Sequence, residues 1–249
     1  MNLILWQTIY VLGGILMLPV MPFLYLQGQY VRRKVGRLPD AAGEKSGTFT
    51  VDDEETVSLL VLGESTAAGV GASTHETGLA GQFARFLGEK IGKSVRWQVV
   101  GKSGITVKRT IDELVPLIPS EKFDYIMLAL CGNEVLSLRS PRAFRRDMRR
   151  LIALLKAQHP EATFFITNAP AVHLSPVLPF PIKNILSQLS AMHDANAREF
   201  TVEMPQVFYF HRPSSVPEDF FADGIHPSEK GYTVWSKRMI EFFEEKYNW

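Results

Sequence analysis

The sequence predicts an α/β domain, a three-layer α/β/α sandwich with a parallel sheet, preceded by one apolar N-terminal helix. From residue 57 to the C-terminus, short runs rich in β-branched and aromatic residues alternate with helical patterns. Such strict alternation indicates βαβ units. The first and third runs are also apolar at nearly every position, as expected of parallel strands buried on both faces.

The order of elements follows from these patterns. Strands are expected at residues 57–62, 95–100, 123–130, 163–167 and 207–210. Helices are expected at residues 77–91, 106–117, 141–158, 182–198 and 228–247. Ligands of such sheets bind outside the carboxyl ends of the strands, so chemistry is expected in the residues that directly follow each strand.

The N-terminal segment is apolar enough to be a membrane anchor. Its first 31 residues contain no Asp, Glu, Lys or Arg, and residues 3–26 could cross a hydrocarbon core of ~30 Å at ~1.5 Å per residue. Pro19 and Pro22 would kink or end the helix. A cleaved signal peptide would need a basic start and a small-residue cleavage site, and neither is visible. We expect residues 1–28 to anchor the chain in a membrane.

The side of the membrane follows from the next residues. Four basic side chains come directly after the apolar segment, at Arg32, Arg33, Lys34 and Arg37. The positive-inside tendency then places the remaining chain in the cytoplasm, with an exported domain facing outside as the alternative. Residues 29–56 are charged and contain Gly, Ser and Pro, which predicts a solvated linker before a folded domain at residues 57–249.

Several classes of function are disfavoured. The net charge is +1, so no global field favours nucleic acid. With a single cysteine, neither an intrachain disulfide nor a multi-cysteine metal site is possible. Two Gly-Lys-Ser triplets lack the earlier glycine of a phosphate-binding loop, and the glycines after residue 63 lack dinucleotide spacing. We expect no metal, no organic cofactor and no nucleic-acid partner.

Four short motifs lie where chemistry is expected. They are Gly63-Glu64-Ser65-Thr66, Gly101-Lys102-Ser103-Gly104-Ile105-Thr106, Gly132-Asn133-Glu134 and Asp223-Gly224-Ile225-His226-Pro227. Each motif alone is weak, but their order, spacing and position at strand ends resemble the four blocks of the SGNH hydrolase (GDSL-type esterase/lipase) family. The resemblance covers residues 57 to about 243. It implies a flavodoxin-like sheet and a serine esterase.

The residue types in these motifs suit acyl transfer. A serine hydroxyl is a poor nucleophile until a base accepts its proton, and His226 would be that base for Ser65. Asp223 could accept the other ring N–H and fix the tautomer. The resemblance implies the same triad, with an oxyanion hole made by the backbone N–H groups of Ser65 and Gly104 and the side-chain amide of Asn133.

The chain departs from the family pattern at three positions. Glu64 and Glu134 stand where most members have Asp, but neither position has a catalytic role, so the triad is unaffected. Cys131 replaces the glycine or other small residue common before Gly132. A nucleophilic cysteine would need a base and a lowered pKa, and a buried apolar role is the favoured interpretation.

The substrate class depends on weaker signals. The proline-rich, apolar segment 170–181 follows the fourth strand and is expected to form a wall or lid of the cleft. We identify His173, Leu174 and Val177 as candidate substrate-binding residues. Together with membrane tethering, this loop favours lipid-like or acyl esters, lysophospholipids among them. The alternatives are a carbohydrate O-acetylesterase and a catalytically silent, membrane-anchored binding module on the same scaffold.

Overall fold

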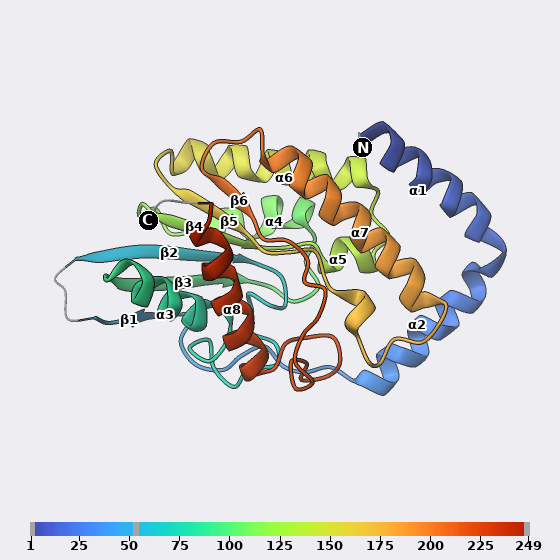
Figure 1. The fold of residues 1–249 in the computed structure, drawn as a ribbon, viewed down its shortest axis with the longest axis horizontal. Helices are drawn as coiled ribbons and strands as arrows, with labels where there is room; N and C mark the ends of the chain where they lie inside the picture. The colour runs from blue at the N-terminus through green and yellow to red at the C-terminus, as the bar shows by residue number, and fades with distance from the viewer. Residues whose placement is uncertain (1–2, 52–54, 247–249) are drawn as a thin grey trace.

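The core of the protein is a six-stranded sheet between two layers of helices (Figure 1). The computed structural model describes residues 3–51 and 55–246. The strands lie in the order β1-β3-β2-β4-β5-β6. Their bounds are β1 Ser46–Phe49, β2 Thr56–Gly63, β3 Ser94–Gly101, β4 Tyr125–Ala129, β5 Thr163–Ile166 and β6 Val207–Tyr209. Strands β2 to β6 are parallel in the flavodoxin order, which confirms the predicted fold class.

The two helical layers bury alternate residues of the strands. Leu60 and Leu62 of β2 point into the core under α4, α6 and α7, whereas Leu59 and Val61 point toward α3 and α8. Successive side chains of a strand face opposite sides, so a central strand covered on both faces is apolar throughout. The helices are α3 Leu79–Ile91, α4 Val107–Glu113, α5 Gly132–Leu136, α6 Pro141–Gln158, α7 Ile182–Thr201 and α8 Glu229–Glu244.

Two local features differ from the predicted elements. The helix expected at residues 106–117 is divided into α4 and a 3-10 turn at Val115–Leu117, because Pro116 has no N–H to continue an α-helix. The short helix α5, directly after β4, is not predicted by any periodic pattern. It carries the Gly-Asn-Glu motif, so this motif lies on a helix rather than in a loop.

Part of the segment expected to be a solvated linker packs on the domain. Residues 46–49 form the antiparallel edge strand β1 beside β3. Just before it, the N–H of Ala41 donates to the carbonyl of Ala68 at 2.9 Å. Pairing with the otherwise open edge of β3 satisfies backbone groups that a free linker would leave to water. Residues 52–54 of this segment, like residues 1–2 and 247–249, lie outside the described residues.

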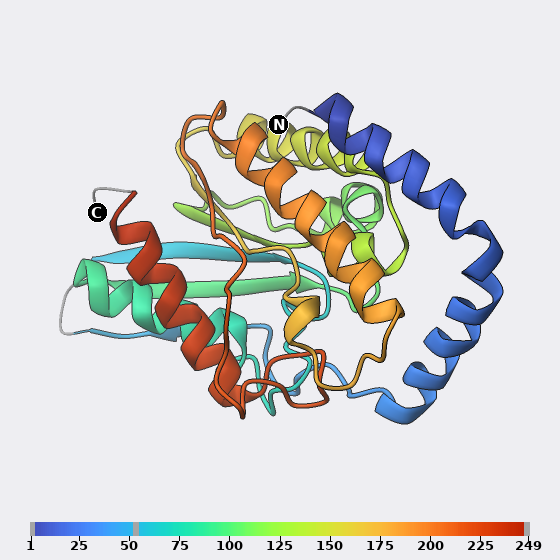
Figure 2. The ribbon, with the colours of Figure 1, turned by 45° about the vertical axis from the view of Figure 1, so that its right-hand side comes forward.

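The N-terminal apolar helix is present as predicted, and it is bent. It comprises α1 (Leu3–Met17), a 3-10 turn (Leu18–Val20) and α2 (Met21–Val35). By length and composition it could cross a membrane, a test that a signal sequence also passes. The two prolines account for the break, since each removes a backbone donor. The bent helix arches beside the domain, with α1 against α6 and α7, and α2 against α7 (Figure 2).

Candidate active site

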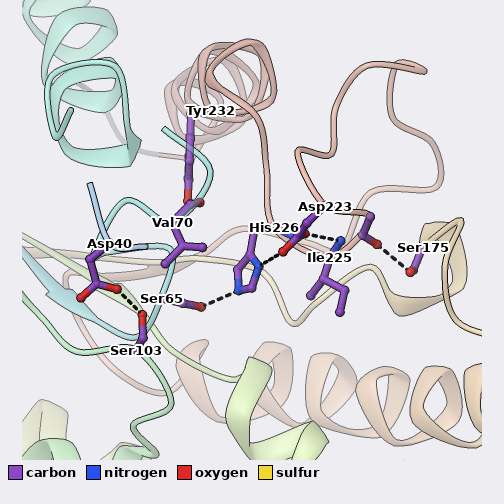
Figure 3. Close-up of polar contacts among 10 residues, drawn as sticks. Asp40, Ser65, Val70, Ser103, Ser175, Asp223, Ile225, His226 and Tyr232 are labelled. Carbon is purple, nitrogen blue, oxygen red and sulfur yellow. Dashed lines mark hydrogen bonds and ion pairs between the residues drawn. The ribbon is translucent and has the colours of Figure 1, made fainter. Parts of the chain in front are cut away.

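Ser65, His226 and Asp223 form a continuous hydrogen-bonded chain (Figure 3). Ser65 follows β2, and its Oγ lies 3.1 Å from Nε2 of His226. Nδ1 of the same ring lies 2.8 Å from Oδ2 of Asp223. Ser65 and His226 are half-buried, so a ligand can approach the hydroxyl while the pair stays ordered. In this geometry the ring can take the serine proton on one nitrogen and keep a proton facing the carboxylate on the other.

The Asp223 carboxylate also organises its own loop. Its Oδ1 accepts the backbone N–H groups of Ile225 at 2.8 Å and His226 at 2.7 Å. Burial opposes ionisation here, but the hydrogen bonds from the His226 ring and from these two N–H groups hold the pKa of Asp223 below its usual value. The carboxylate is therefore charged near neutral pH. It stabilises an imidazolium on His226 when one forms.

Close packing fixes the His226 loop against the serine turn. Gly71 has φ +96°, and a Cβ built there would lie 2.1 Å from the carbonyl oxygen of Pro227. Only glycine permits this approach. On the same turn, the hydroxyl of Tyr232 from α8 donates to the carbonyl of Val70 at 2.7 Å (Figure 3). Together these contacts hold the turn that follows Ser65 against the loop that carries His226.

Two of the three expected oxyanion donors are free in the structure. Within the described residues, neither the N–H of Ser65 nor that of Gly104 donates to a protein acceptor. Gly104 has φ +80° in the turn after β3. The preceding Ser103 donates its hydroxyl to Asp40 at 2.6 Å, so the segment before β1 contacts this turn (Figure 3). Free N–H groups beside a nucleophile are the feature that an oxyanion hole requires.

The third expected donor, Asn133, is engaged. Its side-chain Nδ2 donates to the carboxylate of Glu64 and to the carbonyl of Ile105, the latter at 3.0 Å. An oxyanion could receive a hydrogen bond from this amide only if one of these bonds were exchanged. The assignment of Asn133 to the oxyanion hole therefore stays a prediction, and the structure shows two acceptors that compete for its amide hydrogens.

Two buried carboxylates join the motifs around Ser65. Glu64 accepts the N–H groups of Gly132 at 2.6 Å and Asn133 at 2.8 Å, at the start of α5. Glu134 accepts the N–H of Val107 at 2.8 Å, at the start of α4. Burial raises the pKa of both carboxyls to about 7, against the hydrogen bonds that favour their charged forms. The sequence shows that both residues are acidic, but it does not reveal their hydrogen-bond partners, which belong to other segments of the chain.

The three candidate substrate-binding residues lie on the loop after β5, in different settings. Val177 packs against Gly224 of the Asp223 loop, and the neighbouring Ser175 donates its hydroxyl to the Gly224 carbonyl at 2.6 Å. His173 and Leu174 lie half-buried in a 3-10 turn, Val172–Leu174. Within the described residues, neither hydrogen-bonds to the triad. Burial lowers the pKa of His173, assisted by nearby Arg212 and Lys183.

Cys131 is not suited to nucleophilic chemistry. Its side chain is buried, and burial raises the pKa of the thiol well above its usual value. It precedes α5 with φ +143°, a backbone conformation that side-chain-bearing residues rarely adopt. In the parts of the chain that the structure describes, no group of three His, Cys, Asp or Glu side chains could hold a metal ion.

Comparisons with known proteins find similar sequences. Residues 61–234 match the model of the GDSL-like Lipase/Acylhydrolase family. The spore germination lipase LipC of Bacillus licheniformis is 22% identical over 204 residues, which cover 74% of this chain and 95% of that protein.

Solved structures show the same fold. The lipase Lip_vut3 from a goat rumen metagenome has a TM-score of 0.59 at 18% identity, covering 74% of this chain and 96% of its own. A carbohydrate esterase family 2 enzyme with a carbohydrate binding domain, from Corynascus thermopiles, has a TM-score of 0.58 at 12% identity, covering 81% and 69%.

Proposed function

The chain belongs to the GDSL-like lipase/acylhydrolase family, and we propose that it is a membrane-associated serine esterase that hydrolyses lipid-like or acyl esters through an acyl-serine intermediate. The observation that carries the proposal is the chain from Ser65 Oγ through His226 to Asp223, at 3.1 and 2.8 Å. It supplies a nucleophile, a base and a group that orients the base.

The reaction has two steps. In the first, His226 takes the proton of Ser65 as Oγ attacks the ester carbonyl, and the resulting oxyanion accepts the N–H groups of Ser65 and Gly104. The C–O bond to the alcohol breaks, and His226 returns the proton to that leaving oxygen. In the second step, water attacks the acyl-serine with the same base, which releases the carboxylic acid and restores Ser65.

Two features support an apolar acyl group. Val177 packs against the catalytic loop at Gly224, so an apolar side chain lies next to the Asp223 backbone. The N-terminal helix, with a composition that could enter a membrane, is attached to the same domain. The lipases among the relatives suggest the same class, whereas the carbohydrate esterase on the same fold suggests an acetylated sugar as the competing substrate.

The test uses the full chain in mild detergent with p-nitrophenyl esters from acetyl to palmitoyl. We expect hydrolysis that is lost in Ser65→Ala and retained in Ser120→Ala, an exposed serine remote from the motifs. A fluorophosphonate probe should label the protein, but not the Ser65→Ala variant. Preference for long chains supports lipid-like esters, whereas turnover limited to acetyl esters favours the carbohydrate alternative. No turnover and no labelling would indicate a non-catalytic binding module.

A further inference from the structure

Two glutamines of the apolar N-terminal helix are bonded to the starts of two domain helices. The side-chain oxygen of Gln7 accepts the N–H of Arg142, in the first turn of α6, at 3.2 Å. The side-chain oxygen of Gln27 accepts the N–H of Ile182, the first residue of α7, at 3.2 Å, and its Nε2 donates to the Phe180 carbonyl at 2.8 Å. First-turn N–H groups have no partner within their own helix, so both glutamines act as caps.

These contacts place the apolar helix at the active-site edge of the sheet. In a βαβ unit the helix begins near the carboxyl end of the preceding strand. The starts of α6 and α7 therefore lie at the same edge as Ser65. Figures 1 and 2 show α1 and α2 arching along this edge, away from the opposite edge where α7 ends.

The outward face of the arch is apolar and exposed. Of residues 3–35, only Leu24 and Val31 are buried. Large apolar side chains more than half exposed occur along both helices, at Ile4, Leu12, Ile15, Leu16, Leu18, Phe23, Tyr25, Leu26 and Tyr30. Phe180, whose carbonyl is bound by Gln27, is itself 76% exposed and extends this surface onto the domain. Large apolar side chains exposed along a whole helix mark a contact surface for protein or membrane.

Length and polarity argue for one arrangement of this helix in a membrane. Each half has 15 residues, or roughly 22 Å at ~1.5 Å per residue, which is shorter than a ~30 Å hydrocarbon core. Straightening the helix across a bilayer would also detach Gln7 and Gln27, leaving their amides in hydrocarbon and the N–H groups of Arg142 and Ile182 without these acceptors. The docked, bent form keeps the bond from Arg142 to Gln7 and both bonds of the Gln27 side chain.

We infer that α1 and α2 lie in the plane of an anionic phospholipid bilayer, with their outward apolar side chains and Phe180 among the acyl chains. In this arrangement the active-site edge of the sheet faces the leaflet. Arg32, Arg33 and Lys34 at the end of α2 have no acidic partner among the described residues, and they meet the anionic headgroups there. The inference rests on the proposed esterase function for its consequence, namely that the ester is taken directly from the leaflet.

The loop after β5 connects the membrane surface to the triad. Phe180 lies at its end, bonded to α2 through Gln27, whereas Ser175 and Val177 contact Gly224 in the Asp223 loop. In the inferred arrangement this one loop therefore extends from the leaflet at Phe180 to the Asp223 loop at Val177.

Membrane depth distinguishes an in-plane helix from a spanning one. The full chain with bimane on Ile4→Cys, Leu16→Cys or Leu26→Cys is bound to phosphatidylcholine–phosphatidylglycerol vesicles that contain lipids brominated at different acyl depths. We expect similar, shallow quenching at all three positions, and none for Val202→Cys, which is 87% exposed at the far end of α7. The unsubstituted protein controls for label on buried Cys131. Quenching at Leu16 from the bilayer centre, or no quenching at any position, would overturn the inference.

The second test removes the two caps. Gln7→Ala combined with Gln27→Ala should lower hydrolysis of a fluorogenic long-chain ester embedded in the same vesicles at least 5-fold. The rate on soluble p-nitrophenyl acetate should stay within about twofold, because neither glutamine touches the triad. Gln29→Ala on the same helix is the matched control. If the double variant hydrolyses the vesicle-embedded ester as fast as the parent, in-plane docking is wrong. If the parent protein itself does not hydrolyse p-nitrophenyl acetate, the proposed esterase function is wrong instead.

Discussion

The side-chain amide of Asn133 donates to the carboxylate of Glu64, the residue directly before the nucleophile. Its other hydrogen is used by the carbonyl of Ile105 at 3.0 Å. The resting site therefore holds a neutral amide between a carboxylate and a carbonyl, both hydrogen-bond acceptors. A developing oxyanion on the substrate would compete with these acceptors for the same hydrogens, and a full negative charge attracts them more strongly than a neutral carbonyl does.

Asn133→Ala tests whether this exchange occurs. If the amide moves to the oxyanion in the transition state, the substitution should lower kcat on p-nitrophenyl acetate by a factor on the order of 10²–10³, with little change in KM. Steady-state kinetics measure both constants. Asn184→Ala, an exposed asparagine on α7, should leave both unchanged. A kcat within threefold of the parent would mean that Asn133 only joins α5 to Glu64.

Asp223→Asn separates orientation from charge in the triad. Asparagine can still accept the Ile225 and His226 N–H groups through Oδ1, so the loop should keep its shape. Its amide cannot accept the ring N–H and would stabilise the wrong tautomer of His226. We expect kcat to fall by a factor on the order of 10⁴, with thermal unfolding close to that of the parent. Full activity in this variant would show that His226 does not depend on Asp223.

Glu134→Gln should make stability less dependent on pH. Oε1 of Glu134 accepts the Val107 N–H, and Oε2 is buried with no hydrogen-bond partner among the described residues, so an amide can keep the one hydrogen bond. Burial raises the pKa of Glu134 from 4.5 to about 7. The folded protein therefore binds this proton more tightly than the unfolded chain does. The resulting contribution to the free energy of unfolding is complete below pH 4.5 and is lost as pH rises to about 7. Relative to the parent, the variant should gain up to about 3 kcal/mol across that window.

Chemical denaturation at pH 4.5, 6 and 8 measures this difference. Glu44→Gln, an exposed position in the segment before β1, serves as the control and should follow the parent at each pH. A constant difference between Glu134→Gln and the parent at the three pH values would contradict the expected burial effect.

Cys131 allows a test of backbone strain. Its φ of +143° is unfavourable for any residue with a Cβ, at a cost of order 1–3 kcal/mol. Alanine there keeps the strain, whereas glycine removes it and adds about 0.5–1 kcal/mol of backbone entropy in the unfolded chain. Cys131→Gly should therefore be at least as stable as Cys131→Ala, the reverse of the usual order. Chemical denaturation measures the free energy of unfolding of both variants. A glycine variant that is less stable than the alanine variant by about 1 kcal/mol would exclude strain at this position.

Helices with clear caps and strands with apolar sequences can be predicted from the sequence, because neighbouring residues determine them. Helix α6 has the predicted bounds because Ser140 caps it and Pro141 suits its first turn. The buried strands are visible as apolar runs. In contrast, β1 has the weak strand sequence Ser-Gly-Thr-Phe, and it forms only because the edge of β3 is available to it. Tertiary pairing of this kind leaves no periodic signal in the sequence.

In the candidate site, too, some residues can be predicted from sequence motifs, whereas other contacts depend on the fold. Ser65, Asp223 and His226 belong to motifs that can be read locally, and the structure brings them together. The bonds of Glu64 to Asn133 and of Gln27 to Ile182 join residues 69 and 155 positions apart. Whether a polar side chain forms a structural hydrogen bond depends on which groups the fold places beside it. For these residues that information lies outside their own segment.

The strand β1 determines which N-terminal truncations should leave a soluble domain. A fragment that starts after residue 50 would lose β1 together with the Ala41 and Asp40 contacts, and would leave the backbone of β3 open along one side. Open strand edges recruit other chains into intermolecular sheets. Loss of Phe49 would also uncover Gly88 on α3. Proteolytic release of the domain between α2 and residue 40 should give a soluble monomer, whereas cleavage at residues 51–55 should give aggregates.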